Sequence, residues 1–253
     1  MATASVGSST WYRFRPGIGW FEHLWKSVVM QSHADMRAPL RHVLPVGGIA
    51  MDVGAHGGQL TRLLASMVGP SGLIVAVEPS GYARSILGPA LFLRRVRNVI
   101  VIACALGASN GLLVLRTPLK RLGAMGWGLA NLSAADQQQR QSVAEPVPVL
   151  TLDDLVQGLE LTRLDFIKVD IEGHEAAFVA GGKATLARFR PALLLEMSAS
   201  RMAKAGASPA ALWATLADEF RYFPYELHAG ALKPVTEIPK SSPNVLWLPA
   251  PLP

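Results

Sequence analysis

The sequence predicts an α/β protein with a Rossmann-like, mainly parallel sheet of seven strands and helices on both faces. From Ile49 onward, short and continuous apolar segments alternate with stretches of helical length. Strands that are buried on both faces have this composition, and their alternation with helices is typical of a parallel sheet. Turn signals such as Gly69-Pro-Ser-Gly72 separate the segments. The expected strands are 49–53, 73–77, 99–103, 164–169, 191–195, 222–227 and 244–248.

Composition limits the class of protein. Half of the 253 residues are hydrophobic and 17% are charged, which predicts a folded chain with a full core. The single cysteine, Cys104, excludes an internal disulfide and fits a reducing compartment. The sequence has no run of 18 uncharged apolar residues, so we expect no stable membrane insertion. The N-terminus lacks the basic start and apolar region of a secretory signal, and we therefore expect a cytoplasmic protein.

The net charge of +6 is a weak indicator of partners. One tight basic group contains Arg94, Arg95 and Arg97, but aromatic residues are not interleaved with the basic ones. A single-strand nucleic-acid channel combines both kinds of residue. We interpret the basic group as a solvated surface, since net charge bears on solubility and steering more than on fold.

Two segments depart from the strand and helix alternation. Residues 1–45 are predicted to form an N-terminal helical extension before a main domain at 46–253, because Trp20, Leu24 and Val28 lie at helical spacing. The polar side of this helix is weakly basic, which favours docking on the domain over binding at a membrane surface. Residues 117–145 contain several glycines, Trp127 and a Gln-rich run, and we interpret them as a loop or lid over the substrate. Extra strands are expected on either side of it, at 112–116 and, as an edge strand, at 147–150.

Helices are expected between the strands. The clearest begins after Ser208-Pro209, an N-cap residue followed by proline in the first turn. Thr151 is placed to cap a short helix in the same way. The remaining helical stretches are 59–68, the segment after Pro79, and 174–188.

The functional residues are expected where the strands end. In an open α/β sheet, ligands bind beyond the carboxyl ends of the strands, at the point where the strand order reverses. Gly54 and Gly58 in the first turn allow a tight bend and close approach of a ligand. His56 occupies the place of the second glycine in a dinucleotide fingerprint, so the turn does not match that motif.

The acids at the first two strand ends indicate the ligand. Asp52 would repel a diphosphate but suits a cationic group, such as the amino group of a methionine moiety. Glu78 is placed to accept both hydroxyls of a ribose. An acidic end, a sulfonium and a ribose describe S-adenosylmethionine, which we predict as the cofactor. The predicted cofactor-binding residues are Asp52, Gly54, Ala55, His56, Gly58, Glu78, Cys104 and Ala105.

The chemistry is expected at the fourth main strand. Asp170 and His174 are predicted to hold or deprotonate an acceptor hydroxyl, with Glu172 fixing its orientation. An alternative is that Asp170, Glu172 and Glu196 bind a divalent cation, although no dense ligand motif requires a metal and none is expected. Glu172 and Glu175 are also consistent with a purely structural role near a helix N-terminus, where acids interact well with the helix dipole.

The chain resembles the FkbM family of S-adenosylmethionine-dependent methyltransferases. The resemblance covers about residues 47–250 and is most specific in the run Ile167-Lys-Val-Asp-Ile-Glu-Gly-His-Glu175. One departure is His56, where the family most often has Asn, although an imidazole can make similar hydrogen bonds. The other matching segments are Met51-Asp-Val-Gly-Ala-His-Gly-Gly58, Val77-Glu-Pro79, Ala105-Leu-Gly107, Thr151-Leu-Asp-Asp-Leu155, Gly181-Gly182, Thr185-Leu186, Pro191 to Glu196 and Asn244 to Pro249.

The resemblance implies a class I methyltransferase fold and O-methylation of a sugar, glycan or secondary metabolite. The segment after the fourth main strand is not the Asn/Asp-Pro-Pro-Tyr of enzymes that methylate amino groups of nucleic-acid bases. We therefore expect a small-molecule or carbohydrate acceptor and no nucleic-acid partner, and a homo-oligomer is left open. Two alternatives also stay open: an NAD(P)-dependent oxidoreductase on the same kind of sheet, and a non-catalytic module that retains the fold.

Overall fold

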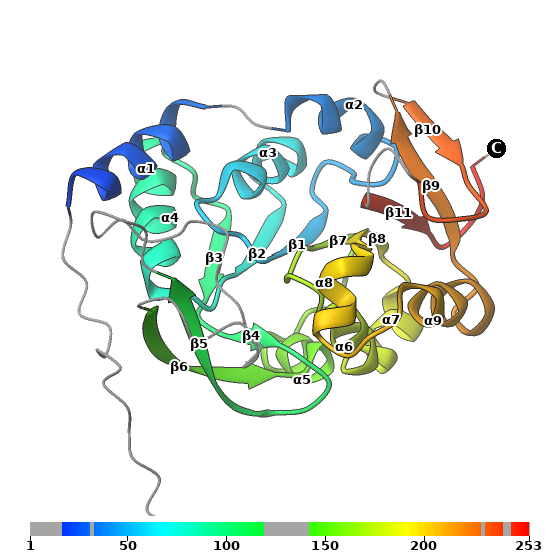
Figure 1. The fold of residues 1–253 in the computed structure, drawn as a ribbon. Helices are drawn as coiled ribbons and strands as arrows, with labels where there is room; N and C mark the ends of the chain where they lie inside the picture. The colour runs from blue at the N-terminus through cyan, green and yellow to red at the C-terminus, as the bar shows by residue number, and fades with distance from the viewer. Residues whose placement is uncertain (1–16, 31–32, 119–141, 229–230, 240–243, 253) are drawn as a thin grey trace, which may run out of the picture.

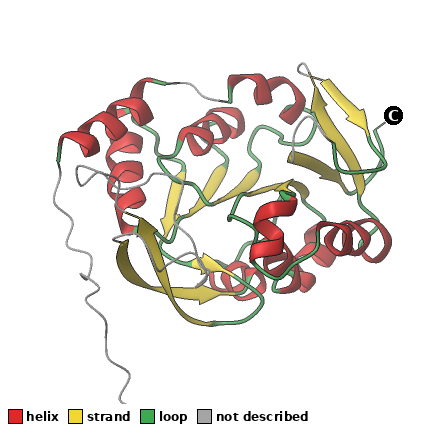
Figure 2. Ribbon diagram, in the orientation of Figure 1, coloured by secondary structure: helices red, strands yellow, loops and turns green. Residues whose placement is uncertain are grey.

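The computed structural model describes residues 17–30, 33–118, 142–228, 231–239 and 244–252. It has the predicted Rossmann-like architecture, with one large sheet between two layers of helices (Figures 1 and 2). The predicted number of seven strands is wrong, because the large sheet has eight strands in the order β10-β9-β11-β8-β7-β1-β2-β3. These are β1 Ile49–Val53, β2 Leu73–Val77, β3 Val99–Ile102, β7 Phe166–Val169, β8 Ala192–Glu196, β9 Phe223–His228, β10 Ala231–Pro234 and β11 Asn244–Leu248.

The sheet divides into a parallel half and an antiparallel half. β3, β2, β1, β7 and β8 are parallel, whereas each later pair of neighbours is antiparallel: β8 with β11, β11 with β9, and β9 with β10. Chain order runs outward from β1 through β2 to β3 in one direction and from β7 to β8 in the other, and the last strand, β11, is inserted between β8 and β9. The topological switch point therefore lies between β1 and β7, which pair directly.

The eighth strand, β10, forms a hairpin with β9 at the sheet edge. Sequence analysis did not predict it because its four residues, Ala231–Pro234, are mostly exposed and include a lysine and a proline. Such residues discourage pairing of an edge strand with a further chain, and they conceal the strand pattern in the sequence.

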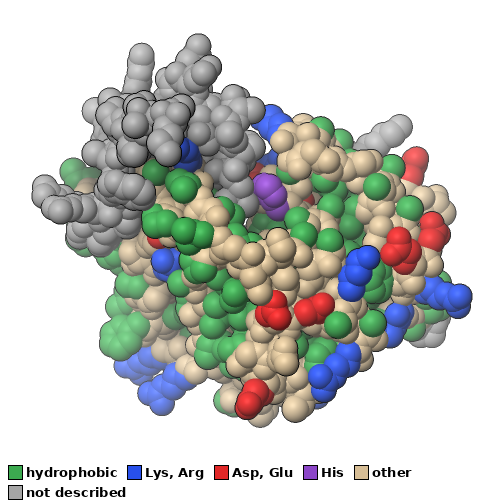
Figure 3. Space-filling model, turned by 90° about the horizontal axis from the view of Figure 1, so that it is seen from below, with side chains coloured by type: hydrophobic (Ala, Val, Ile, Leu, Met, Phe, Trp, Pro, Cys, Tyr) green, Lys and Arg blue, Asp and Glu red, His purple; other side chains and the backbone are tan. Residues whose placement is uncertain are grey.

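Helices cover both faces of the sheet, and hydrophobic clusters lie between the helices and the sheet on each face. On one face, side chains of α2, α3 and α4 pack against the sheet, and on the other those of α5 to α9 do so. Figure 3 shows the outer surface on the side of α5 to α9, where charged side chains are scattered among polar and hydrophobic ones. The helices are α1 Ile18–Val29, α2 Arg37–Leu40, α3 Gln59–Val68, α4 Gly81–Leu93, α5 Leu152–Gly158, α6 Glu175–Ala180, α7 Lys183–Phe189, α8 Ala199–Lys204 and α9 Pro209–Ala214, with shorter turns at Ala34–Met36 and Thr215–Glu219.

One predicted helix is broken in the structure, and one further helix was not predicted. The single helix expected over 174–188 is broken into α6 and α7 at Gly181-Gly182. A Cβ atom on Gly181 would lie 2.1 Å from the carbonyl oxygen of Gly107, so the chain passes too close there for a side chain. The six-residue helix α8, which follows β8, was not predicted.

A second sheet of three strands lies beside the carboxyl end of β3. Its order is β4-β6-β5, with β4 Ala105–Leu106, β5 Gly111–Pro118 and β6 Ser142–Leu150. The segment expected as an edge strand at 147–150 is thus part of the central strand of this sheet. β5 and β6, the two strands on either side of the predicted lid, are both longer than predicted. The ends of the predicted lid at 117–145 belong to β5 and β6, and residues 119–141 lie outside the described residues.

The N-terminal helix α1 packs on α4, as the docking hypothesis predicts. The Trp20 indole N–H donates to Ser85 Oγ at 3.0 Å, and His23 Nδ1 lies 2.7 Å from the hydroxyl of Tyr82. Leu40, also in the predicted extension, is fully buried in the cluster over α3. Within the described part of the chain, no helix is both long enough and apolar enough to cross a membrane.

Candidate cofactor and active site

A cleft opens at the switch point, where β1, β2 and β7 end. It holds about 540 Å³ of space, part of which is open to solvent. The apolar side chains of Val53, Val77, Leu106, Leu115 and Ile171 form much of its lining. The structure brings seven of the predicted site residues into this lining, namely Gly54, His56, Glu78, Cys104, Ala105, Asp170 and Glu172.

The turn after β1 is shaped by contacts that only glycine permits. Gly54 has φ +78°, and a Cβ atom there would lie 2.1 Å from the carbonyl oxygen of Asp170. Gly58 has φ +81°, and its Cβ would lie 2.3 Å from Leu87 Cδ1 on α4. Gly58 and the buried Ala55 belong to the turn but do not line the cleft. Only at Gly54 does the turn present bare backbone to the cleft, which His56 of the same turn also lines.

The Glu78 carboxylate, just after the end of β2, accepts two hydrogen bonds within the protein and can accept more. Its side chain is buried, with 3% of the residue exposed, and it borders the cleft. One carboxylate oxygen accepts the backbone N–H of Ser80 and the other accepts that of His56, both at 2.8 Å. An ionised carboxylate has about four acceptor positions, so each oxygen can accept one more hydrogen bond. The two hydroxyls of a ribose supply two such donors.

The small sheet is tied to the same wall of the cleft. Both carboxylate oxygens of Glu145 on β6 accept the backbone N–H of Gly81, at 3.0 and 2.9 Å. The Arg84 guanidinium lies 3.5 Å from Glu145 and also donates to the backbone carbonyl of Glu78. β6 is thus fastened to the first turn of α4, close to the Glu78 carboxylate.

Asp52 has its partners within the protein. It is fully buried beneath the turn and does not line the cleft. One carboxylate oxygen accepts the hydroxyl of Thr61 at 2.6 Å, and the other lies 3.4 Å from the Lys168 ammonium. The cation that sequence analysis assigned to the ligand is here a lysine side chain.

Lys168, which sequence analysis did not single out, joins the two strands at the switch point. Its ammonium donates to the Gly54 carbonyl at 3.1 Å and lies 3.6 Å from the Asp170 carboxylate. Burial lowers the pKa of Lys168, but the charges of Asp52 and Asp170 outweigh this effect and raise it overall, so the side chain stays charged. The signal in the sequence was a single lysine inside the apolar strand Phe166–Val169.

Asp170 and Glu196, at the ends of β7 and β8, form a pair of acids. Burial raises the pKa of Glu196 to about 7, together with the neighbouring charge and hydrogen bond of Asp170. Burial opposes ionisation of Asp170 as well, but the Lys168 charge and the Glu196 hydrogen bond lower the pKa of Asp170 overall. Below about pH 7 the pair therefore holds one proton, which resides on Glu196.

Arg201 on α8 connects the remaining acids. Its guanidinium pairs with Glu172 at 3.0 Å and makes a shorter contact with Glu196. Glu172 adopts a left-handed backbone conformation with φ +59° at the cleft. Burial raises the pKa of Glu172, opposed by the Arg201 charge. The unpredicted helix α8 thus supplies a cation to two of the candidate site residues.

The turn between β7 and α6 is held by Glu175. This side chain is fully buried, and one carboxylate oxygen accepts the backbone N–H groups of Ile171 and Gly173, at 3.1 and 3.3 Å. His174, the N-cap residue of α6, is half-buried and does not line the cleft. Burial lowers the pKa of His174, which favours its neutral form.

Cys104 lies in the wall of the cleft, just after β3. Burial raises the pKa of the Cys104 thiol to about 11, so this side chain lines the cleft as a small apolar group. Among the residues that the structure describes, no three or more His, Cys, Asp or Glu side chains gather in an arrangement that could hold a metal ion.

This sheet topology, with a glycine turn and an acid at its switch point, defines a Rossmann-like protein of the class I methyltransferase type. The model of the methyltransferase FkbM domain matches residues 52–224, which is more than half of the chain. The chain belongs to the FkbM family of S-adenosylmethionine-dependent methyltransferases.

The chain is similar to several solved structures at low sequence identity. A putative O-methyltransferase from Klebsiella pneumoniae has 10% identity and a TM-score of 0.50, over 93% of this chain and 92% of that one. An O-methyltransferase from Bacillus cereus in complex with SAH has 12% identity and a TM-score of 0.49, over 92% and 91%. The FkbM methyltransferase from Methylobacillus flagellatus has 14% identity and a TM-score of 0.45, over 79% of this chain but 43% of that protein, so the chain matches less than half of its length. No curated protein matches the chain.

Replacing Lys168 by methionine leaves Asp52 buried beside an apolar side chain. We expect K168M to lower the free energy of unfolding by about 3 kcal/mol, as when one partner of a buried ion pair is removed. The double variant D52N/K168M recovers much of this loss, because the amide oxygen of the introduced asparagine still accepts the Thr61 hydroxyl. Urea denaturation measures both values, and K233M on the exposed strand β10 serves as the control. Equal effects of K168M and K233M would contradict the role of the buried pair.

The Asp170–Glu196 pair predicts a pH dependence of stability. Glu196 binds its proton more tightly in the folded chain, so its contribution is complete below the ordinary pKa of 4.5 and is lost as the pH rises through about 7. We expect Tm to fall across this range in the natural chain and to fall less in E196Q, which mimics the protonated acid. Calorimetry at a series of pH values measures the difference. The exposed variant E237Q should keep the natural slope, and parallel curves for all three proteins would exclude the pair as its source.

Proposed function

We propose that the protein is an S-adenosylmethionine-dependent O-methyltransferase that acts on a hydroxyl of a small molecule or carbohydrate. The observation that supports this most is the placement of Glu78 and Asp170 on one cleft, at the ends of β2 and β7. Glu78 offers two free acceptor positions for a nucleoside ribose, and Asp170 offers a carboxylate to the acceptor. Between them lies the bare backbone of the Gly54 turn.

The cleft residues fit the cofactor by their chemistry. Glu78 would accept the two ribose hydroxyls in charge-assisted hydrogen bonds. Cys104 and Ala105, which follow β3, would contact the adenine as small apolar groups. Gly54 would allow the methionine part to approach the backbone. Asp52 acts in this scheme as a positioning residue, since it holds Lys168 and the turn without reaching the cleft.

The cofactor supplies a methyl group bound to a positively charged sulfur. When bound, it would transfer this methyl group to the acceptor oxygen, with the carbon–sulfur electron pair left on sulfur, and would depart as S-adenosylhomocysteine. The acceptor hydroxyl must lose its proton in the process. Alignment of the reacting atoms accounts for much of the acceleration in such displacements, up to about 7–11 kcal/mol in the best cases.

Asp170 is the proposed acceptor of the hydroxyl proton. It lines the cleft, whereas His174 does not. Lys168 favours the ionised form of Asp170, and Glu196 is hydrogen-bonded to it. Once Glu196 has ionised near pH 7, the Asp170–Glu196 pair can take up a further proton and share it between the two carboxylates. Glu172, held by Arg201, is the proposed orienting residue for the acceptor.

Removal of the Glu78 carboxylate tests the cofactor site. We expect E78A to raise the Kd for S-adenosylhomocysteine by about 10- to 100-fold, because two charge-assisted hydrogen bonds are lost. Calorimetry on the folded protein measures the affinity, with E237Q as the exposed control. Tighter binding of NADH than of S-adenosylhomocysteine would instead support the oxidoreductase alternative, and no binding of either would support a non-catalytic module.

The proposed base is tested by turnover on a panel of sugars and polyols with a labelled methyl donor. We expect D170N to reduce kcat by about 100-fold or more while S-adenosylhomocysteine still binds. H174A should retain turnover within a few-fold. A loss in H174A with retention in D170N would assign the base to His174. Full turnover in EDTA excludes the metal-dependent alternative.

A further inference from the structure

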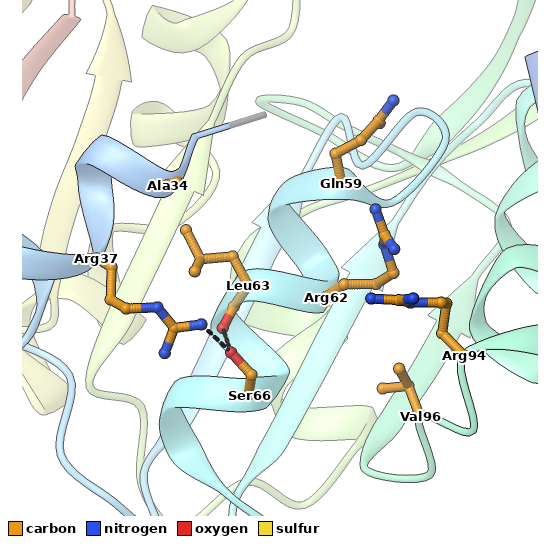
Figure 4. Close-up of a pocket in the computed structure, with 8 residues that line it drawn as sticks. All are labelled: Ala34, Arg37, Gln59, Arg62, Leu63, Ser66, Arg94 and Val96. Atoms are coloured by element: carbon orange, nitrogen blue, oxygen red, sulfur yellow. Dashed lines mark hydrogen bonds between the residues drawn. The ribbon is translucent and has the colours of Figure 1, made fainter. Parts of the chain in front are cut away.

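A second cavity lies away from the cofactor cleft and shares no lining residue with it. It is formed by the outer face of α3, the turn at the start of α2 and the segment after α4 (Figure 4). Measured in the same way as the cofactor cleft, the space inside it is about 700 Å³, part of which is open to solvent. The lining residues are Ala34, Arg37, Gln59, Arg62, Leu63, Ser66, Arg94 and Val96.

The charges around this cavity are all of one sign. Arg37, Arg62 and Arg94 line it, and none of its lining residues is acidic. Within the described part of the chain, none of the three guanidinium groups forms an ion pair with a carboxylate. Figure 4 shows the Arg94 side chain extended toward the Arg62 side chain of α3. Like charges in this arrangement repel, and a bound anion would relieve the repulsion.

Arg62 is built into the wall of the cavity. It donates to the backbone carbonyl oxygens of Val28 and Met30, both at 2.9 Å, and so holds the end of α1. Its Nε atom is buried and has no hydrogen-bond partner among the described residues. Burial and the charge of Arg94 both lower the pKa of Arg62. Arg62 is thus a partly desolvated cation whose neighbours within the cavity are two further cations.

The other two arginines are available to a ligand. Arg37 donates to the hydroxyl of Ser66 at 2.7 Å, which uses one of its five N–H donors. Arg94 is exposed, and its side chain makes no hydrogen bond among the described residues. The sequence groups Arg94 with Arg95 and Arg97, but the structure separates them, since only Arg94 lines the cavity.

We propose that this cavity binds a phosphoryl group, as a phosphate ester or a diphosphate, with Arg94 and Arg37 as its principal donors. The planar guanidinium matches the oxygens of a phosphate in a bidentate manner. The group belongs either to a dissolved molecule or to the headgroup of a phospholipid. The second source is relevant because Arg62 places the end of α1 beside the cavity, and α1 exposes Phe21, Trp25 and Val29.

Calorimetry with inorganic pyrophosphate on the full chain tests the site. We expect one ion to bind per chain, R94Q to weaken binding about tenfold, and R97Q to change it less than twofold. The two variants remove the same charge from neighbouring exposed positions, so a general effect of surface charge would weaken both equally and would overturn the proposal. The Arg94 side chain makes no hydrogen bond in the described chain, so R94Q is expected to remain folded.

A further comparison identifies the source of the phosphoryl group. Vesicles of phosphatidylcholine with and without phosphatidic acid are sedimented with the natural chain, R94Q and R97Q. Binding that requires phosphatidic acid, is reduced in R94Q and is displaced by pyrophosphate assigns a lipid headgroup. Pyrophosphate binding without vesicle binding assigns a dissolved ligand. Binding of neither probe overturns the proposal, whereas the affinity for S-adenosylhomocysteine is expected to stay the same in all three proteins.

Discussion

The candidate site depends on a single buried ammonium group. Lys168 lies on β7, where the strand order reverses, and contacts Asp52 on β1, the Gly54 carbonyl after β1, and Asp170 just beyond the end of its own strand. Asp52 is fully buried and Asp170 is partly buried, and a buried carboxylate costs several kcal/mol unless a cation compensates it. The lysine provides that compensation and also fixes the spacing of the two strand ends. The glycine turn and the proposed base therefore share one electrostatic support.

The acids around the cleft differ in protonation because their surroundings differ. Asp170 is adjacent to Lys168 and stays ionised, whereas Glu196 lies beside the Asp170 charge and holds its proton up to about pH 7. Arg201 counters the charges of Glu172 and Glu196 without removing the effect of Asp170 on Glu196. An adjacent pair with separated pKa values is a common way to provide a proton acceptor near neutral pH.

Local patterns in the sequence were sufficient for the fold class and for the edge of the sheet that carries the cleft. Apolar runs located the parallel strands, and the residues after them predicted that Gly54, Glu78 and Asp170 would meet. The partner of Asp52 was not predictable, because Lys168 is distant in the chain and becomes its neighbour only through the register of β1 and β7. The short helix α8 with Arg201 and the edge strand β10 carry too little pattern to be recognised. The catalytic and cofactor roles of the individual residues stay predictions.

The link between Glu145 and the first turn of α4 has a mechanical consequence. One backbone N–H shared between the two Glu145 oxygens, together with an arginine contact, joins β6 to the segment that carries Glu78. The small sheet, which contributes Leu106 and Leu115 to the lining of the cleft, is thereby braced against the wall that holds Glu78, and the two cannot separate without breaking these bonds. A displacement reaction tolerates little error in the distance between its reacting atoms. These contacts hold the small sheet at a fixed distance from the Glu78 segment, so the width of the cleft does not depend on a bound reactant.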